Sequence, residues 1–457
     1  MMINHEFIYK LLEETKNVAK EDIKRVLNKA RNKENLSFKD IAILLQVEDE
    51  NELKEIYKIA GEVKRSIYGN RIVIFAPLYV SDYCVNNCSY CGYKYNNEFN
   101  RRKLTKEEIQ EEVKLLEKMG HKRLALEAGE DPVNCDIDYI IDAIKSIYET
   151  QNDNGVIRRI NVNIASTTVE NYKKLKEAGI GTYILFQETY HKPTYEKAHL
   201  NGPKANYDYH LTAFNRAMEA GIDDVGAGVL FGLYDYKFEI LALMLHNEYL
   251  EREYGVGFHT ISVPRLKKAQ GMNLEEFPYL LTDEEFKKIV AIIRLAVPFT
   301  GIILSTRETH KIRKEVIEYG VSQISAGSCT GVGGYKESEE GNKLQFEVSD
   351  NRKPFEVIRE LIEEGHVPSY CTACYRMGRT GDRFMSLAKS GQIQNICGPN
   401  AMMTLLEYSL DYGDEELQNT VDNMINREIE NIEREDIKNL LLNKIDRIKK
   451  GERDLYL

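Results

Sequence analysis

The chain has 457 residues, 42% of them hydrophobic, which is enough for one large core with smaller additions. Its formal net charge of −11, with Lys and Arg scattered along the sequence, argues against nucleic acid and an anionic membrane surface as partners. No apolar run approaches about 18 residues and residues 1–20 lack the apolar core of a signal peptide, so we expect a cytoplasmic protein without a membrane span.

The first 70 residues carry a helical pattern. Apolar residues recur at spacings of three and four in Val18–Ala30 and Phe38–Leu45. From Ile72 the pattern changes to short β-type runs that alternate with amphipathic helices. The predicted strands are Ile72–Val80, Arg123–Glu127, Ile160–Ile164, Thr182–Gln187, Val225–Phe231, His259–Val263, Gly301–Ser305 and Val321–Ser325. The predicted helices between them include Lys106–Met119, Val169–Ala178, Tyr207–Ala220, Lys237–Glu253, Glu284–Ala296 and Lys311–Tyr319.

Eight successive βα units favour a closed parallel barrel over an open doubly wound sheet. The predicted architecture is an α/β protein with an N-terminal helical segment (1–70), a TIM-type (β/α)8 barrel (71–335) and a mostly helical C-terminal extension (336–457). In such a barrel the C-terminal ends of the strands form the edge that carries the active site. Polar residues that follow the predicted strands are therefore candidates for function.

Three cysteines follow the first predicted strand with the spacing C-x3-C-x2-C: Cys84, Cys88 and Cys91. Because this location is reducing, the eight Cys of the chain are expected to be metal ligands or free thiols rather than disulfides. Three thiolates on one loop can hold three irons of a cubane cluster and leave the fourth iron open. A zinc loop is the alternative, but zinc wants four ligands and prefers paired C-x2-C units.

With the aromatic Tyr90 before the last Cys, this loop resembles that of the radical SAM enzymes. The resemblance implies a [4Fe-4S] cluster whose open iron takes the amino and carboxylate groups of S-adenosylmethionine (SAM). Strand two ends in Glu127-Ala128-Gly129-Glu130, which resembles the family element that binds the methionine amino group. The candidates for cofactor binding are Tyr90, Tyr93, Gly129, Glu130, Asn163, Ser166, Glu188 and His210, with His210 placed where relatives hold a cation near the SAM carboxylate.

A substrate site is predicted where strands seven and eight end. Arg307 follows strand seven, and an Arg at a barrel mouth can form a bidentate pair with a carboxylate. A salt bridge to a Glu of a nearby loop is the alternative role. Ser325 and Ser328, near the end of strand eight, are predicted to assist Arg307 in holding a small amino acid.

A second cysteine group lies in the C-terminal extension: Cys371, Cys374 and Cys397, with the spacing C-x2-C-x22-C. Together with the first triplet, it indicates a second iron–sulfur cluster rather than zinc. A full radical SAM barrel followed by this spacing resembles the HydG family of [FeFe]-hydrogenase maturation over essentially the whole chain. His259, at the start of strand six, is matched to the family's histidine for a labile iron.

The resemblance implies cleavage of L-tyrosine at Cα–Cβ to p-cresol and dehydroglycine. The second cluster, a 4Fe-4S cluster with a labile fifth iron, would then form CO and cyanide for an Fe-CO-CN synthon of the hydrogenase H-cluster. The implied partners are a reductant such as ferredoxin or flavodoxin and other hydrogenase maturation proteins. The alternatives are a ThiH-like 2-iminoacetate synthase and an iron–sulfur carrier or scaffold. Cys135 and Cys329 have no spacing partners and are expected to have no role in the clusters.

Overall fold

The computed structural model describes residues 2–336 and 344–457. Within these residues, eight parallel strands close into a barrel in the order β1-β2-β5-β6-β7-β8-β9-β10, with β10 pairing back onto β1. The predicted (β/α)8 fold is thereby confirmed, and each predicted strand overlaps a barrel strand. The strands are β1 (Arg71–Ser81), β2 (Arg123–Ala128), β5 (Arg159–Asn163), β6 (Tyr183–Glu188), β7 (Val225–Val229), β8 (Thr260–Ser262), β9 (Gly301–Leu304) and β10 (Gln323–Ser325).

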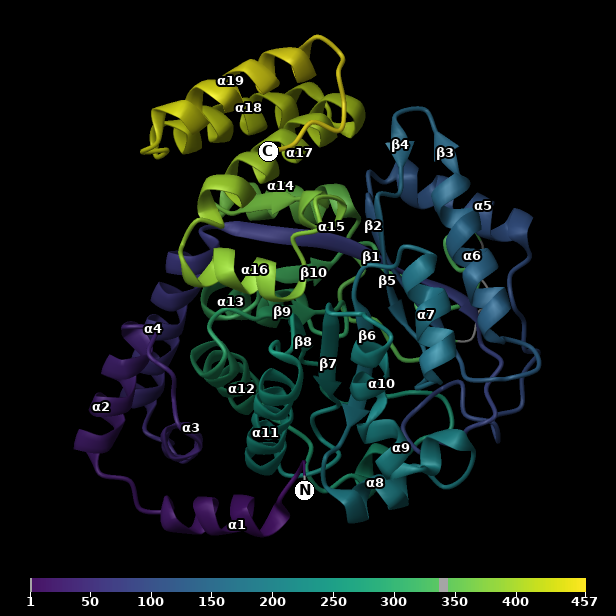
Figure 1. Cartoon of the computed structure of the whole chain (residues 1–457), viewed down its shortest axis with the longest axis vertical. Helices are drawn as coiled ribbons and strands as arrows, with labels where there is room; N and C mark the ends of the chain where they lie inside the picture. The colour runs from purple at the N-terminus through teal and green to yellow at the C-terminus, as the bar shows by residue number, and fades with distance from the viewer. Residues whose placement is uncertain (1, 337–343) are drawn as a thin grey trace.

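Amphipathic helices surround the barrel strands (Figure 1). Side-chain caps fix several of their starts: Thr105 with Glu108, and Thr282 with Glu285, form reciprocal capping boxes. The predicted helix 207–220 is two helices that meet at Thr212, whose hydroxyl donates to the carbonyl of Asp208 at 2.8 Å. The helices are α5 (Lys106–Lys118), α6 (Ile137–Glu149), α7 (Val169–Glu177), α8 (Lys192–Ala198), α9 (Tyr207–Leu211), α10 (Ala213–Glu219), α11 (Tyr236–Tyr254), α12 (Asp283–Ala296) and α13 (His310–Tyr319).

The N-terminal segment packs its helices along one side of the barrel, α4 against α12 and α13, and α1 against α11 (Figure 1). Ser37 and Asp40 form a capping box at the start of the third helix. Asp40 also accepts from Arg25 at 2.9 Å and from Lys29 at 3.0 Å, which ties the second helix to the third. The four helices are α1 (His5–Glu14), α2 (Lys20–Arg31), α3 (Phe38–Leu45) and α4 (Glu50–Tyr68).

The C-terminal extension attaches to the barrel through a short additional strand. β11 (Val367–Ser369) pairs in parallel with the start of β1, in the register Arg71↔Val367. This pairing places the residues that follow β11 beside the starts of the barrel strands. The helices of the extension are α14 (Pro354–Glu363), α15 (Ala373–Arg376), α16 (Gly381–Lys389), α17 (Gln394–Tyr412), α18 (Glu415–Glu430) and α19 (Glu435–Lys449), and the last three stack at one end of the molecule (Figure 1).

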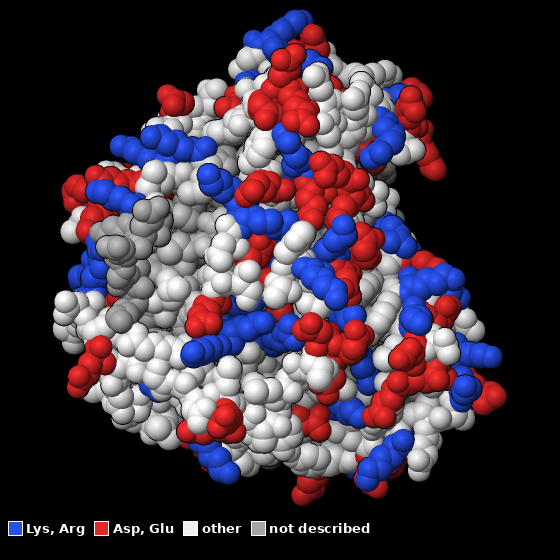
Figure 2. All heavy atoms as spheres, turned by 180° about the vertical axis from the view of Figure 1, so that it is seen from behind, with Lys and Arg blue, Asp and Glu red and all other residues white. Residues whose placement is uncertain are grey.

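Acidic and basic side chains are interspersed over the face seen in Figure 2, without one extended area of a single sign. In the described part of the chain, no helix combines the length and the apolar character that a membrane span requires.

Candidate functional site

The first cysteine loop follows β1 at the edge where the barrel strands end. Backbone bonds fix it: Val85 N–H donates to the carbonyl of Glu130 at 2.8 Å, and Ser89 N–H donates to the carbonyl of Ala198 at 2.9 Å. Cys88 is buried, whereas Cys84 and Cys91 are partly exposed. All three face one cavity, which we call the strand-end cavity. This is the position that the barrel rule predicts for a catalytic loop.

The chemistry of this loop fits an iron–sulfur cluster. Burial raises the pKa of Cys88 strongly and that of Cys91 to about 11, so their thiolates need positive charge beside them, which iron supplies. Among the described residues, no three Cys, His, Asp or Glu side chains converge on a point where a single ion would sit. A cubane binds each thiolate to a different iron, so cysteines spread around a cavity suit it better than they suit one zinc ion.

Most of the residues predicted to bind the cofactor line the strand-end cavity. Gly129 lets the backbone of Tyr83 approach, since a Cβ there would meet the Tyr83 carbonyl oxygen at 2.4 Å. Glu130 accepts a hydrogen bond from Asn86 Nδ2 at 2.5 Å. The predicted residues that line the cavity are Tyr90, Tyr93, Gly129, Glu130, Asn163, Glu188 and His210. Ser166 follows β5 and does not line this cavity, so the structure does not place it with the others.

His210 does not supply the cation that we predicted for this cavity. Its Nε2 lies 2.9 Å from the backbone carbonyl of Phe186, and burial lowers its pKa to about 3, so the ring is neutral. A cation that does line this cavity is Lys204, whose ammonium donates to Glu188 Oε1 at 2.7 Å. Lys204 lies in the short 3-10 helix Pro203–Ala205 and does not directly follow a barrel strand in the sequence, so the barrel rule that selected the other candidates could not select it.

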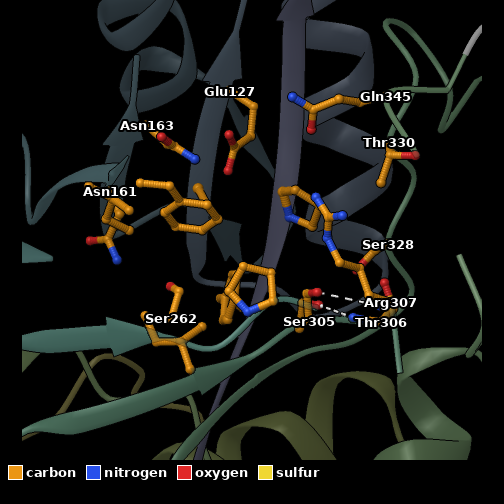
Figure 3. Close-up of a pocket in the computed structure, with 18 of the residues that line it drawn as sticks. Glu127, Asn161, Asn163, Ser262, Ser305, Thr306, Arg307, Ser328, Thr330 and Gln345 are labelled. Carbon is orange, nitrogen blue, oxygen red and sulfur yellow. Dashed lines mark hydrogen bonds between the residues drawn. The ribbon is translucent and has the colours of Figure 1, made fainter. Parts of the chain in front are cut away.

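A second cavity, the interior cavity, occupies the inside of the barrel (Figure 3). The three predicted substrate residues, Arg307, Ser325 and Ser328, all line it. Arg307 stacks on the ring of Phe346, with its guanidinium carbon 3.3 Å from the ring centroid. The alternative role of Arg307 is not seen: the next residue, Glu308, pairs instead with Arg265 at 2.6 Å, and no described residue forms an ion pair with Arg307.

The two serines differ in what they offer a ligand. Ser325 Oγ accepts the N–H of Thr306 at 3.1 Å and so helps to hold the loop that carries Arg307. Ser328 Oγ is buried without a hydrogen-bond partner among the described residues. Glu127 and Gln345, which sequence reasoning did not select, also point into the cavity (Figure 3). Glu127 is the last but one residue of β2, so its position near a strand end was the available signal.

The second cysteine group lines a third cavity, at the edge where the barrel strands start. We call it the strand-start cavity. It brings Cys371, Cys374 and Cys397 together with His259, which precedes β8. Cys371 follows β11, Cys374 lies in α15 and Cys397 in α17. Two arginines that start strands, Arg71 and Arg123, also line it and were not predicted, although an Arg at the start of two neighbouring strands was visible in the sequence.

The donors of this cavity also fit a sulfur-ligated cluster with an imidazole beside it. Cys374 and Cys397 share a hydrogen bond, which lowers the pKa of Cys374 to about 7 and raises that of Cys397. His259 Nε2 lies 3.2 Å from the hydroxyl of Tyr375, while its Nδ1 is buried without a partner among the described residues. Burial lowers the pKa of His259, which keeps the imidazole in the neutral form that metals bind.

The three cavities share walls. Glu127, Asn163, Phe186, Arg307, Gln345 and Phe346 line both the strand-end and the interior cavities. Gln323, on β10, lines both the interior and the strand-start cavities. The interior cavity therefore lies between the two cysteine groups.

Comparisons with known proteins agree with this arrangement. Residues 78–245 match the Radical SAM superfamily, and residues 262–367 match the Biotin and Thiamin Synthesis associated domain. The chain is 30% identical over 348 residues to the 2-iminoacetate synthase of Salmonella typhimurium, which covers 76% of this chain and 89% of the relative.

Two solved structures match nearly all of the chain. The crystal structure of HydG, described as a maturase of the [FeFe]-hydrogenase, is 60% identical, covers 100% of both chains and superposes with a TM-score of 0.97. HydG from Carboxydothermus hydrogenoformans is 40% identical, covers 96% of this chain and 97% of its own, and has a TM-score of 0.84. The chain belongs to the HydG family of radical SAM proteins.

Proposed function

We propose that this protein is a carbon–carbon lyase that cleaves L-tyrosine between Cα and Cβ into p-cresol and dehydroglycine. The second cysteine site then converts dehydroglycine to CO and cyanide, which leave with iron as a synthon for the H-cluster of [FeFe]-hydrogenase. Two relatives support this proposal: a HydG described as a hydrogenase maturase, and a 2-iminoacetate synthase, since 2-iminoacetate is another name for dehydroglycine. The partners are the other maturation proteins.

Cys84, Cys88 and Cys91 would hold a [4Fe-4S] cluster, and Glu130 would take the amino group of SAM. With an electron from a reductant such as ferredoxin or flavodoxin, this group supplies a 5′-deoxyadenosyl radical in the strand-end cavity. Cys371, Cys374 and Cys397 would hold the second cluster, with His259 for its labile iron.

Arg307 would hold the carboxylate of tyrosine. Its guanidinium has no ion pair with any described residue, and it lines both the strand-end and the interior cavities, so a ligand bound there lies beside the radical source. The stacking on Phe346 limits the positions that the guanidinium can adopt. The free hydroxyl of Ser328 can add a hydrogen bond, and Ser325 positions the Arg307 loop.

The observation that carries the proposal is the interior cavity, which shares walls with both cysteine sites. Dehydroglycine is an imine that water hydrolyses. Apolar residues such as Phe75, Pro77 and Pro264 line the passage and limit the access of water. A fragment released beside Arg307 can reach Gln323, and thus the strand-start cavity, without entering bulk solvent.

The test is a turnover experiment with the anaerobically reconstituted full chain, SAM, dithionite and tyrosine. The expected products are 5′-deoxyadenosine, p-cresol, and CO trapped by deoxymyoglobin. p-Cresol with glyoxylate but no CO would indicate a ThiH-like 2-iminoacetate synthase instead. Absence of 5′-deoxyadenosine would indicate an iron–sulfur carrier or scaffold.

A further inference from the structure

Glu127 has a position that the proposed roles do not use. It is the last but one residue of β2, and its side chain points into the interior cavity from between Asn163 and Gln345 (Figure 3). Its carboxylate lines the strand-end cavity as well, so it lies on the boundary between the radical source and the substrate space. A carboxylate on that boundary contacts whatever bridges the two cavities.

The groups around Glu127 do not fully compensate the cost of burying its negative charge. Arg307, which follows β9, is near enough to lower the pKa of Glu127, and the Asn163 amide also does so by a hydrogen bond. Tyr79, on β1, is a further titratable group that interacts with Glu127. Burial outweighs these contributions and raises the pKa of Glu127 to about 8. A ligand cation placed beside it would offset that cost.

The chemistry of the proposed reaction requires a proton acceptor near the substrate nitrogen. That nitrogen carries three hydrogens in the ammonium form of tyrosine and one in the neutral imine of dehydroglycine. The radical takes one hydrogen atom from the substrate, so at least one of the two that nitrogen loses leaves as a proton. Arg307 cannot accept a proton, because its guanidinium is always charged.

We propose that Glu127 binds the amino nitrogen of the substrate and accepts a proton from it, so that Glu127 and Arg307 together recognise a free α-amino acid. The two side chains face the same space and supply one negative and one positive group (Figure 3). A zwitterionic amino acid presents the complementary pair on one carbon atom. The inference rests on the proposed cleavage of tyrosine and assigns the residue that handles its nitrogen.

The first test compares L-tyrosine with 3-(4-hydroxyphenyl)propanoate, which lacks only the amino group. Binding is measured by calorimetry on the full chain loaded with SAM, with the cluster oxidised so that no cleavage occurs. Glu127→Gln should weaken tyrosine binding by about ten- to hundredfold, the contribution of a charge-assisted hydrogen bond, and should change binding of the analogue less than about threefold. Glu117→Gln, at a buried glutamate of α5 that lines neither cavity, is the matched control and should change neither affinity.

The second test needs no substitution, so it stands even if Glu127→Gln fails to fold. At pH 7 the free carboxyl is mostly protonated, because its pKa is about 8. When the ammonium group of tyrosine binds there, the carboxyl gives up its proton and forms an ion pair with the ammonium. Tyrosine binding should therefore release close to one proton to the buffer. Titrations in two buffers of different ionisation enthalpy measure this release, which should fall as the pH rises from 7 towards 8 and the free carboxyl ionises. The analogue should release none.

Equal loss of affinity for both ligands in Glu127→Gln, or equal proton release by both ligands in the wild type, would overturn the assignment. So would a variant that loses affinity for SAM but keeps its preference for tyrosine, because Glu127 would then serve the cofactor. A wild-type protein that binds and cleaves no tyrosine would instead contradict the proposed function itself.

Discussion

The two cysteine sites lie at opposite edges of the same barrel, but the chain builds them differently. The first uses one loop. Its cysteines lie within the eight residues from Cys84 to Cys91, and the strand before them ends at Ser81. The second needs three separate elements, with Cys371 after β11, Cys374 in α15 and Cys397 in α17. The cysteines of the first site therefore all come from one loop of the barrel. The second exists only where the C-terminal extension meets the starts of the barrel strands.

The two sites also differ in the charged side chains that line them. The strand-end cavity carries Glu127, Glu130 and Glu188 together with Lys204 and Arg307. The strand-start cavity carries Arg71 and Arg123, and none of its lining residues is Asp or Glu. Carboxylates with cations suit zwitterions, such as SAM and tyrosine. Arginines without carboxylates suit thiolates and small anions. In the proposed function, the two edges would accordingly serve two successive steps.

We expect the largest loss of activity when the strand-end site is removed. Cys88→Ala removes the buried thiolate of the first loop, and with it the cluster that supplies the radical. Both p-cresol and CO should fall below detection, and the electron paramagnetic resonance signal that responds to SAM should disappear. Cys135→Ala, at a cysteine outside both groups, is the control and should retain both products. Retained tyrosine cleavage in Cys88→Ala would contradict the assignment of the first cluster.

Arg307→Ala should separate substrate binding from the function of the two cysteine sites, because it replaces no cysteine of either group. Losing a charge-assisted contact with the carboxylate costs about 1.5–3 kcal/mol, so the KM for tyrosine should rise about ten- to hundredfold while the signal of the first cluster is unchanged. Arg307→Lys keeps the charge but loses the bidentate geometry, and its KM should lie between the two. The assignment fails if the tyrosine dependence of p-cresol formation is the same in all three proteins.

His259→Asn should affect only the strand-start site. The imidazole is buried against Phe384 and Tyr375, far along the chain from the first loop. Loss of a metal ligand should lower the CO yield by at least about tenfold, while p-cresol is retained and the second cluster stays intact. Iron and sulfide counts, with both products quantified, check this. A parallel fall of CO and p-cresol would show that His259 acts on the whole fold.

The smallest effect concerns the passage between the sites. Gln323→Leu keeps the side-chain size at the residue shared by the interior and strand-start cavities, and removes its amide. Loss of one neutral hydrogen bond to the passing fragment, worth about 0.5–1.5 kcal/mol, should lower the ratio of CO to p-cresol by about two- to tenfold. Glyoxylate should rise by the same amount, as trapped dehydroglycine hydrolyses. An unchanged ratio would exclude Gln323 from the route.

The same contrast explains which features the sequence predicts. The eight strands and the first triplet are local patterns, since each depends on a short run of residues and its spacing. β11 was missed because Val367–Ser369 is three residues long and contains Pro368, so pairing with β1 rather than local preference makes it a strand. The predicted helix 207–220 divides at Thr212, whose hydroxyl bonds to the carbonyl of Asp208, and the apolar pattern does not indicate this division.

Charge states were the least predictable part of the site. His210 was expected to be a cation, but its place beneath Phe186 buries it and leaves it neutral. Lys204 supplies a positive charge from the short 3-10 helix Pro203–Ala205, whose sequence carries no motif, and only the fold brings it to Glu188. Glu127 was visible near a strand end. That it lines two cavities could not be predicted, because Arg307 and Gln345, which line the same two cavities, come from distant parts of the chain.

The central claim is that cleavage of tyrosine and formation of CO occur at different edges of the barrel. Parallel time courses of p-cresol and CO on Cys374→Ala test it most directly. The account predicts p-cresol within about twofold of the wild-type rate, because distant sites act independently, and no detectable CO. CO released at the wild-type rate by Cys374→Ala would contradict the account, because the second cysteine group would then not be the site of that step.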